Sequence, residues 1–214
     1  MISVLYTDAQ IVVCVNPSGI LSQDSGENSL PQQLCRQLNV EVLYVVHRLD
    51  KEVGGVMVYA RTKAAAAALS RAVQEHRLEK IYLAVLRGIP EVPQAVLEDL
   101  LFHDKMKNKT YVVKRARKGV KDARLDYTVL ETVEERSLVQ VHLHTGRTHQ
   151  IRVQFASRKM PLVGDGKYGG KESGCALGLW AKQLSFPHPK TGEMMTFSAL
   201  PEKEKPWSEF IAVQ

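Results

Sequence analysis

The stretch that decides the fold is residues 42–60, VLYVVHRLDKEVGGVMVYA. Its opening is apolar and rich in β-branched residues, which predicts a strand over residues 42–46. The strand ends abruptly in His47-Arg48-Leu49-Asp50-Lys51, where four of five side chains are ionisable. Two glycines follow, able to bring the backbone close to a ligand, and then a second strand over 56–60. The stretch therefore predicts a loop that presents a carboxylate among cations.

Working outward, the remaining elements follow from apolar periodicity and turn residues. Helices are predicted over residues 30–38, 63–76 and 207–213, and from a cap at Thr148 through Phe155. Within the predicted strand 137–144, Gln140, His142 and His144 face away from its apolar side. Strands dominate without regular strand–helix alternation, so the fold class is α+β. The other predicted strands cover residues 4–6, 10–15, 81–86, 110–114, 124–132, 137–144 and 177–186, and a glycine-rich loop covers 161–174.

Composition bounds the class of protein. Apolar residues make up 44% and charged residues 24% of the 214 residues, ordinary values for a globular chain. No apolar run reaches the roughly 20 residues of a membrane span, and the N-terminus does not read as a signal peptide. Cys14, Cys35 and Cys175 are odd in number and far apart, which favours a reduced, cytoplasmic protein over a disulfide framework or a thiolate zinc site.

Positive charge is concentrated in one segment. Residues 105–124 hold nine basic residues and one acid, whereas the whole chain carries a net charge of +6. A basic stripe of this kind is the electrostatic footprint of a polyanion partner. A solvated basic hairpin without a partner is the alternative, and composition alone leaves both open.

Three segments carry candidate chemistry. Asp50, at the end of a strand and beside cations, suits a nucleophile or base; a weak surface salt bridge is the alternative. Arg147 stands just before a predicted helix, where amide groups and an arginine can hold a phosphate or carboxylate; two solvated arginines are the alternative there. Lys80 and Tyr82 share one strand face, suited to stacking on a nucleobase, although most strand tyrosines pack in a core.

Metal and nucleotide sites are disfavoured. His142, His144 and His149 invite a metal site, but we expect no Asp, Glu or Cys near them to complete a ligand set. The loop around Gly166-Lys167 lacks the spacing of a phosphate-binding P-loop. The residue patterns therefore disfavour a metal ion and a P-loop at these positions.

In this order, the segments resemble the RluA-type pseudouridine synthase family. The resemblance rests on four motifs and extends over roughly residues 4–200. Four motifs in the correct order are far more specific than one. They are His47-Arg48-Leu49-Asp50 with Gly55 and Ala60, Lys80-x-Tyr82-x-Ala84-x-x-x-Gly88, Gly146-Arg147-x-His149-Gln150-Ile151-Arg152, and Gly164-Asp165-x-x-Tyr168-Gly169.

The resemblance implies a mixed, mainly antiparallel sheet flanked by helices, with an RNA cleft, as one catalytic domain over residues 1–214. It implies isomerisation of uridine to pseudouridine in rRNA or tRNA, without a metal or organic cofactor. The sequence does not indicate an oligomeric state, and a monomer is the default expectation. Asp50 would be the essential carboxylate, Arg147 would pair with it, and Tyr82 would pack on a flipped target base. Arg48 would enter the RNA stack. The remaining predicted RNA contacts are His47, Lys80, Lys114, Arg115, Arg117, Lys118, His149 and Arg152.

The chain departs from the family pattern in two places. Val53-Gly54 stands where the family has Thr-Ser, and Asn16 precedes Pro17 where a lysine is usual. The sequence also leaves no room before Met1 for the S4-like RNA-binding domain of many relatives. Two competing hypotheses remain: an RNA-binding module of the same fold without activity, and a metal-dependent hydrolase that uses the histidines.

Overall fold

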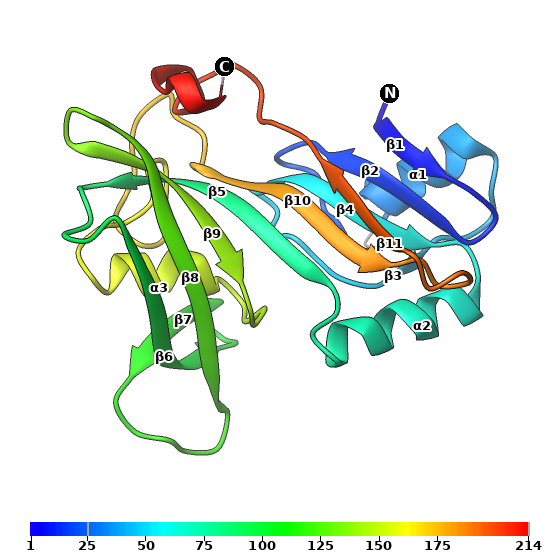
Figure 1. Cartoon of the computed structure of the whole chain (residues 1–214), viewed down its shortest axis with the longest axis horizontal. Helices are drawn as coiled ribbons and strands as arrows, with labels where there is room; N and C mark the ends of the chain where they lie inside the picture. The colour runs from blue at the N-terminus through cyan, green and yellow to red at the C-terminus, as the bar shows by residue number, and fades with distance from the viewer. Residues whose placement is uncertain (25, 214) are drawn as a thin grey trace. The chain divides into compact units, whose positions relative to one another are not determined.

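The computed structural model describes residues 1–24 and 26–213. Its contacts divide the chain into two compact units. Unit 1 comprises Met1–Lys80 and Trp180–Leu200, and unit 2 comprises Ile81–Leu179 and Pro201–Gln214. Figure 1 shows strands and helices in both, as an α+β fold requires.

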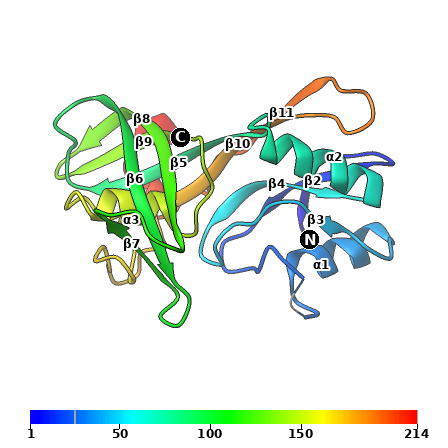
Figure 2. The same ribbon diagram turned by 90° about the horizontal axis from the view of Figure 1, so that it is seen from below.

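Unit 1 is a small mixed sheet with two helices. Strand β2 pairs antiparallel with β1 and β4, β3 also pairs antiparallel with β4, β4 pairs parallel with β10, and β10 pairs antiparallel with β11. Helix α2 packs Ala65 and Leu69 against the apolar side chains of β2, β4 and β10, and Figure 2 shows it running beside β4. The elements are β1 (Ser3–Thr7), β2 (Ile11–Asn16), α1 (Leu30–Leu38), β3 (Tyr44–Val45), β4 (Gly54–Ala60), α2 (Lys63–Gln74), β10 (Leu179–Pro187) and β11 (Met194–Ser198).

Unit 2 is an antiparallel sheet packed against one short helix. The strands pair in the order β5, β9, β8, β6 and β7. The α3 side chain of Phe155 meets the ring of Tyr127 at 5.4 Å between centroids, which places α3 on one side of β8. The elements are β5 (Glu79–Arg87), β6 (Gln94–Asp104), β7 (Lys109–Val113), β8 (Val120–Val133), β9 (Arg136–Leu143), α3 (Gln150–Ala156) and the 3-10 turns η1 (Trp207–Glu209) and η2 (Ile211–Val213).

Most predicted elements are present, and each difference between prediction and structure has a structural cause. The strand predicted over 42–46 shrinks to Tyr44–Val45, because the amide of Val58 on β4 donates to Nε2 of His47 instead of to a neighbouring strand. The predicted helix over 207–213 is wrong: extended backbone at Phe210 separates two 3-10 turns. Strands β6 and β11 were missed, because their apolar residues do not alternate cleanly with polar ones.

The cap predicted at Thr148 is also wrong. Helix α3 begins after His149, whose backbone is left-handed at φ 55°, and no side chain caps the helix. The carbonyl of Thr148 instead accepts a hydrogen bond from the hydroxyl of Thr110 on β7. The left-handed turn changes the direction of the chain, so the residues before α3 form a separate loop.

Close packing around the loop 161–174 gives a stability prediction. A Cβ added to Gly170 would lie 1.8 Å from the carbonyl oxygen of Leu162, whereas one added to Gly166 meets nothing within 4 Å. Gly170→Ala should therefore lower the free energy of unfolding by at least roughly 2 kcal/mol. Gly166→Ala, the matched control, should change it by less than about 0.5 kcal/mol. Chemical denaturation of the two variants measures the difference, and equal midpoints would contradict the packing.

Candidate functional site

The loop that carries Asp50 is held by the chain segment 16–22. The hydroxyl of Ser22 donates to the carbonyl of Leu49 and accepts from its amide, at 2.9 and 3.0 Å. The carbonyl of Asp50 accepts from the amide of Val53 at 2.9 Å, closing a tight turn. The side chain of Asp50 is half-buried. This loop therefore has a fixed backbone and presents its carboxylate at a partly exposed position, as a reactive group requires.

Gly54 and Gly55 serve the packing of this loop. A Cβ on Gly54 would lie 2.4 Å from the ring of Trp180, and one on Gly55 would lie 2.3 Å from the carbonyl oxygen of Ala181. The glycine pair thus lets β4 approach β10 closely, and the approach to a ligand predicted for it stays a prediction. A serine at position 54, where the family pattern has one, would collide with the ring of Trp180.

His47 and Arg48 differ in exposure although they are neighbours. His47 is buried, and its Nε2 accepts the amide hydrogen of Val58 at 3.2 Å. Burial and then the positive charge of Lys80 lower the pKa of His47 to about 3. Its ring is therefore neutral near pH 7 and shapes the loop. Arg48 is exposed and donates to Oε1 of Gln23 at 2.7 Å. Of the two predicted RNA contacts, the geometry suits Arg48.

Lys80 and Tyr82 lie on β5, on either side of the boundary between the units. Lys80 is half-buried, and loss of water around it lowers the pKa of its ammonium group. Tyr82 is buried, pairs in register with Val141 of β9, and so shares its sheet face with the apolar core of unit 2. The stacking role predicted for Tyr82 stays a prediction.

The loop before α3 holds Arg147 against β8. Nε of Arg147 donates to the carbonyl of Asp122 at 2.8 Å. The amide of Arg147 donates to Oε1 of Gln150, whose Nε2 donates in turn to the carbonyl of Arg124. Asp50 belongs to unit 1 and Arg147 to unit 2. Their predicted ion pair therefore remains a prediction, while the fixed position of Arg147 within unit 2 is an observation.

Arg152 forms the most deeply buried ion pair of this region. Its Nε and Nη2 donate to the two carboxylate oxygens of Asp165 at 2.7 and 2.8 Å, and the two side chains are 3% and 0% exposed. Such burial suits a structural role far better than the phosphate contact expected of Arg152. Sequence reasoning gave Asp165 no role, although an acid among glycines beside a basic motif was a signal for this partner.

The aromatic side chains of Tyr168 and His149 lie next to the ion pair of Arg152 and Asp165. The hydroxyl of Tyr168 accepts the amide hydrogen of Thr110 at 2.8 Å and lies 3.0 Å from Nδ1 of His149. His149 is buried. His149 therefore has little exposed surface with which to make the predicted RNA contact. Its imidazole instead fixes the start of α3.

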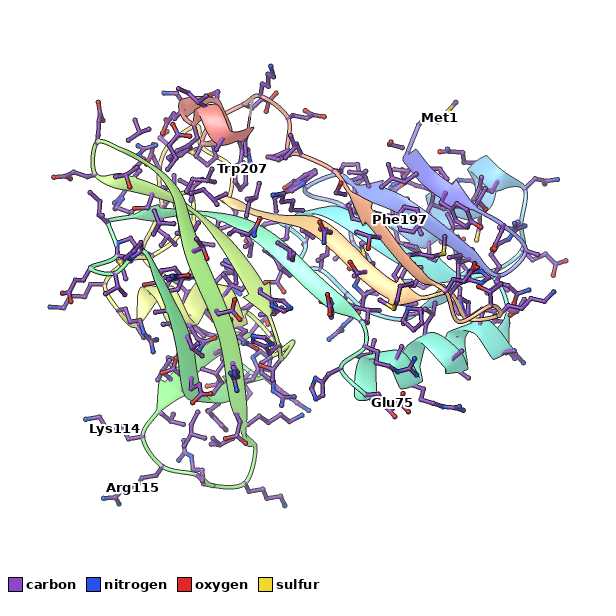
Figure 3. The ribbon with its side chains drawn as sticks, viewed as in Figure 1. Met1, Glu75, Lys114, Arg115, Phe197 and Trp207 are labelled. Carbon is purple, nitrogen blue, oxygen red and sulfur yellow. The ribbon has the colours of Figure 1, made fainter. Side chains whose placement is uncertain are left out.

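Residues 114–119, part of the basic segment 105–124, form an exposed loop between β7 and β8. Lys114, Arg115, Arg117 and Lys118 are all exposed, and Figure 3 shows Lys114 and Arg115 pointing outward from this loop. The guanidinium of Arg117 lies 4.8 Å from the ring centroid of Phe102, which gives the loop an anchor on β6. These four cations are open to solvent, and their predicted RNA phosphate contacts stay a prediction.

The histidines prove to have an acidic neighbour. Asp126 on β8 stands in register with His142 on β9, and its carboxylate also bonds Nε2 of His144. The expectation that no acidic residue lies near the histidines is therefore wrong, because strand pairing brings together residues 16 apart in the sequence. His149 is not part of this group.

Comparison with known proteins assigns the family. A family model described as RNA pseudouridylate synthase matches residues 10–157. An uncharacterised RNA pseudouridine synthase from Aquifex aeolicus is 35% identical over 92% of this chain and 68% of its own length. A tRNA pseudouridine synthase C from Haemophilus ducreyi is 30% identical over 95% of this chain and 92% of its own length.

Two further matches agree. The ribosomal large subunit pseudouridine synthase D of Neisseria meningitidis serogroup B is 33% identical over 92% of this chain, which spans 58% of that relative's length. The solved structure of human RNA pseudouridylate synthase domain containing 1 superposes with a TM-score of 0.80 at 25% identity, over 95% of this chain and 84% of that one.

The chain therefore belongs to the RNA pseudouridylate synthase family. Enzymes of this family are isomerases that convert uridine to pseudouridine in RNA, and the resemblance found in the sequence is confirmed. The α+β pseudouridine synthase fold is confirmed as well. Among the described residues, 1–24 and 26–213, no helix is long and apolar enough to cross a membrane.

The buried pair gives a prediction with a pH dependence. Burial alone would raise the pKa of Asp165, but the hydrogen bonds and charge of Arg152, with the amides of Lys167 and Tyr168, hold it below its ordinary value. The pair therefore stabilises the fold above about pH 4, the ordinary carboxyl pKa, and this contribution is lost as pH falls through the lowered value. Asp165→Asn leaves Arg152 buried without its partner charge and should cost roughly 3–5 kcal/mol at pH 7.

The measurement is chemical denaturation between pH 7 and pH 3, with exposed Glu41→Gln as the matched control. The difference in the free energy of unfolding between the parent protein and Asp165→Asn should become smaller in acid. The control should have the same free energy of unfolding as the parent at every pH. A difference in the free energy of unfolding that stays constant with pH would show that the charge of Asp165 does not stabilise the fold.

Proposed function

We propose that this chain isomerises uridines of rRNA or tRNA to pseudouridine, with Asp50 as the essential carboxylate. The observation that carries the proposal is the loop itself. Within the part of the chain that the family model matches, a backbone fixed by Ser22 presents Asp50 half-buried beside exposed Arg48. The relatives' printed names include both tRNA and ribosomal large subunit synthases, so either RNA is a substrate class to test.

Isomerisation of uridine to pseudouridine requires that the base be detached from the sugar and rotated. The glycosidic bond must break at nitrogen, the uracil must turn, and a bond to carbon must form, which calls for a nucleotide flipped out of the stack at a cost of a few kcal/mol. In our proposal Asp50 is ionised and acts as nucleophile or base, and Arg147 stabilises its charge. Tyr82 packs on the target base, and Arg48 enters the stack in its place. This route needs neither a metal nor an organic cofactor.

The exposed cations position the RNA. Lys114, Arg115, Arg117 and Lys118 contact phosphates, which fixes the RNA without reading its sequence. Lys80, from its half-buried position, adds charge near the loop of Asp50 within unit 1. We further propose that the chain acts as a monomer in the cytoplasm; its three cysteines are free thiols.

The decisive test replaces the proposed carboxylate. Asp50→Asn removes the charge at nearly constant shape and should lower pseudouridine formation by roughly 10³-fold or more, the scale of a lost nucleophile or acid–base group. Exposed Asp24→Asn is the matched control and should retain activity. The measurement is a pseudouridine map of cellular rRNA and tRNA from a strain without the gene, complemented with each variant.

Outcomes of this test separate the hypotheses. An RNA map that does not change on loss of the gene would favour a binding module without activity. Activity that persists in Asp50→Asn would exclude the assigned carboxylate. Activity lost on treatment with a chelator would revive the metal-dependent hydrolase.

A second prediction concerns the basic loop. Replacing Lys114, Arg115, Arg117 and Lys118 by glutamine should weaken RNA binding and reduce the slope of log K against log salt by about 3, since each neutralised phosphate contributes about 0.7–0.9. Replacing four exposed cations outside this loop by glutamine, Lys63, Arg71 and Lys190 of unit 1 and Lys203 of unit 2, removes the same charge elsewhere. That control should leave the slope nearly unchanged. Equal effects of the two sets would mean that only net charge matters.

A further inference from the structure

Three side chains of unit 2 converge outside the proposed catalytic machinery. Asp126 of β8 and His142 of β9 are register partners, and His144 follows two residues later on the same side. One ligand atom from each residue lies within 4.8 Å of the others. Nδ1 of His142 is 3.8 Å from Oδ1 of Asp126, and Nε2 of His144 bonds that same oxygen. The centroids of the two imidazole rings lie 4.4 Å apart, and the ring planes are inclined to each other by 50°.

Strand geometry makes this group accessible. Tyr127 and Val141 point to the side of the sheet that α3 covers, so Asp126 and His142 point to the opposite side. The side chains of Asp126, His142 and His144 are 40%, 38% and 34% exposed. The neighbouring cation on β8, Arg124, pairs with Glu98 of β6 at 3.5 Å. The carboxylate of Asp126 is thus directed toward the imidazoles, at a surface that an ion can reach.

We propose that Asp126, His142 and His144 form a binding site for a divalent transition-metal ion, with Zn²⁺ as its representative. Two imidazole nitrogens and a carboxylate oxygen are a donor set that suits Zn²⁺, whereas Mg²⁺ and Ca²⁺ prefer oxygen ligands throughout. Three protein ligands leave a fourth tetrahedral position for solvent. On binding, the ion replaces the hydrogen bond between His144 and Asp126 and holds both groups.

The site adjoins the loop that carries Arg147. The amides of His144 and Thr145 both donate to the carbonyl of Arg124, at 3.2 Å. Nε of Arg147 donates to the carbonyl of Asp122, on the same strand. A metal ion bridging β8 and His144 therefore fastens the beginning of this loop to its supporting strand. The site is separate from the proposed chemistry, which uses no metal.

Zinc binding to the full chain tests the proposal without any measurement of turnover. The protein is freed of metal with a chelator, and Zn²⁺ is titrated in competition with a chromogenic chelator. We expect one ion per chain. The double variant His142→Gln/His144→Gln, and separately Asp126→Asn, should bind at least about tenfold more weakly, the lower bound for losing even a hydrogen-bond partner of a metal ligand.

His76→Asn is the matched control, because His76 is exposed, lies in unit 1 and already has a left-handed backbone that asparagine tolerates. It should bind Zn²⁺ like the parent protein. An excess of Mg²⁺ should not displace the ion. Binding by the parent that is no tighter than binding by the double variant, or displacement by Mg²⁺, would overturn the proposal. Because this assay needs no RNA, its result is independent of whether Asp50 catalyses isomerisation.

Discussion

The buried ion pair between Arg152 and Asp165 is the interaction on which the arrangement of unit 2 depends. It joins α3 to the glycine-rich loop, and the carboxylate also accepts the amide hydrogens of Lys167 and Tyr168. A buried ion pair stabilises a fold only when its remaining hydrogen-bonding capacity is used, and here it is. The resulting turn places the Tyr168 hydroxyl against His149, so one interaction fixes both the loop and the start of the helix.

That fixed helix start determines how Arg147 is presented. A left-handed backbone at a residue other than glycine costs roughly 1–2 kcal/mol, and His149 adopts it at φ 55°. Two interactions offset this cost. The His149 ring contacts the hydroxyl of Tyr168, and Oε1 of Gln150 accepts the amide hydrogen of Arg147. Arg147 is consequently held in one position by Gln150 and the carbonyl of Asp122. Under the proposed function, a group held in this way can stabilise charge without reorganising during the reaction.

The sequence was informative wherever side-chain periodicity was strong. The apolar alternation of β9 and the alanine-rich helix α2 were predicted nearly to their ends. It was uninformative where contacts between distant residues decide the outcome. The His47 ring that bonds the amide of Val58, and the pairing that brings Asp126 to His142, depend on strand register, which no local pattern encodes. The motif containing Asp50 was found by resemblance, and its local chemistry alone did not distinguish it from a surface loop.

Burial divides the charged residues of the motifs into two groups with different tasks. His47 and Arg152 are buried and bonded, so His47 shapes the loop in which it lies and Arg152 joins α3 to the glycine-rich loop. Arg48 and the cations of the β7–β8 loop remain exposed, so under the proposed function their charge can act over distance on a polyanion. A motif of this kind cannot be read as a list of RNA contacts. Under the proposed function its buried basic residues set the local geometry within each unit, while its exposed ones and Asp50 meet the RNA.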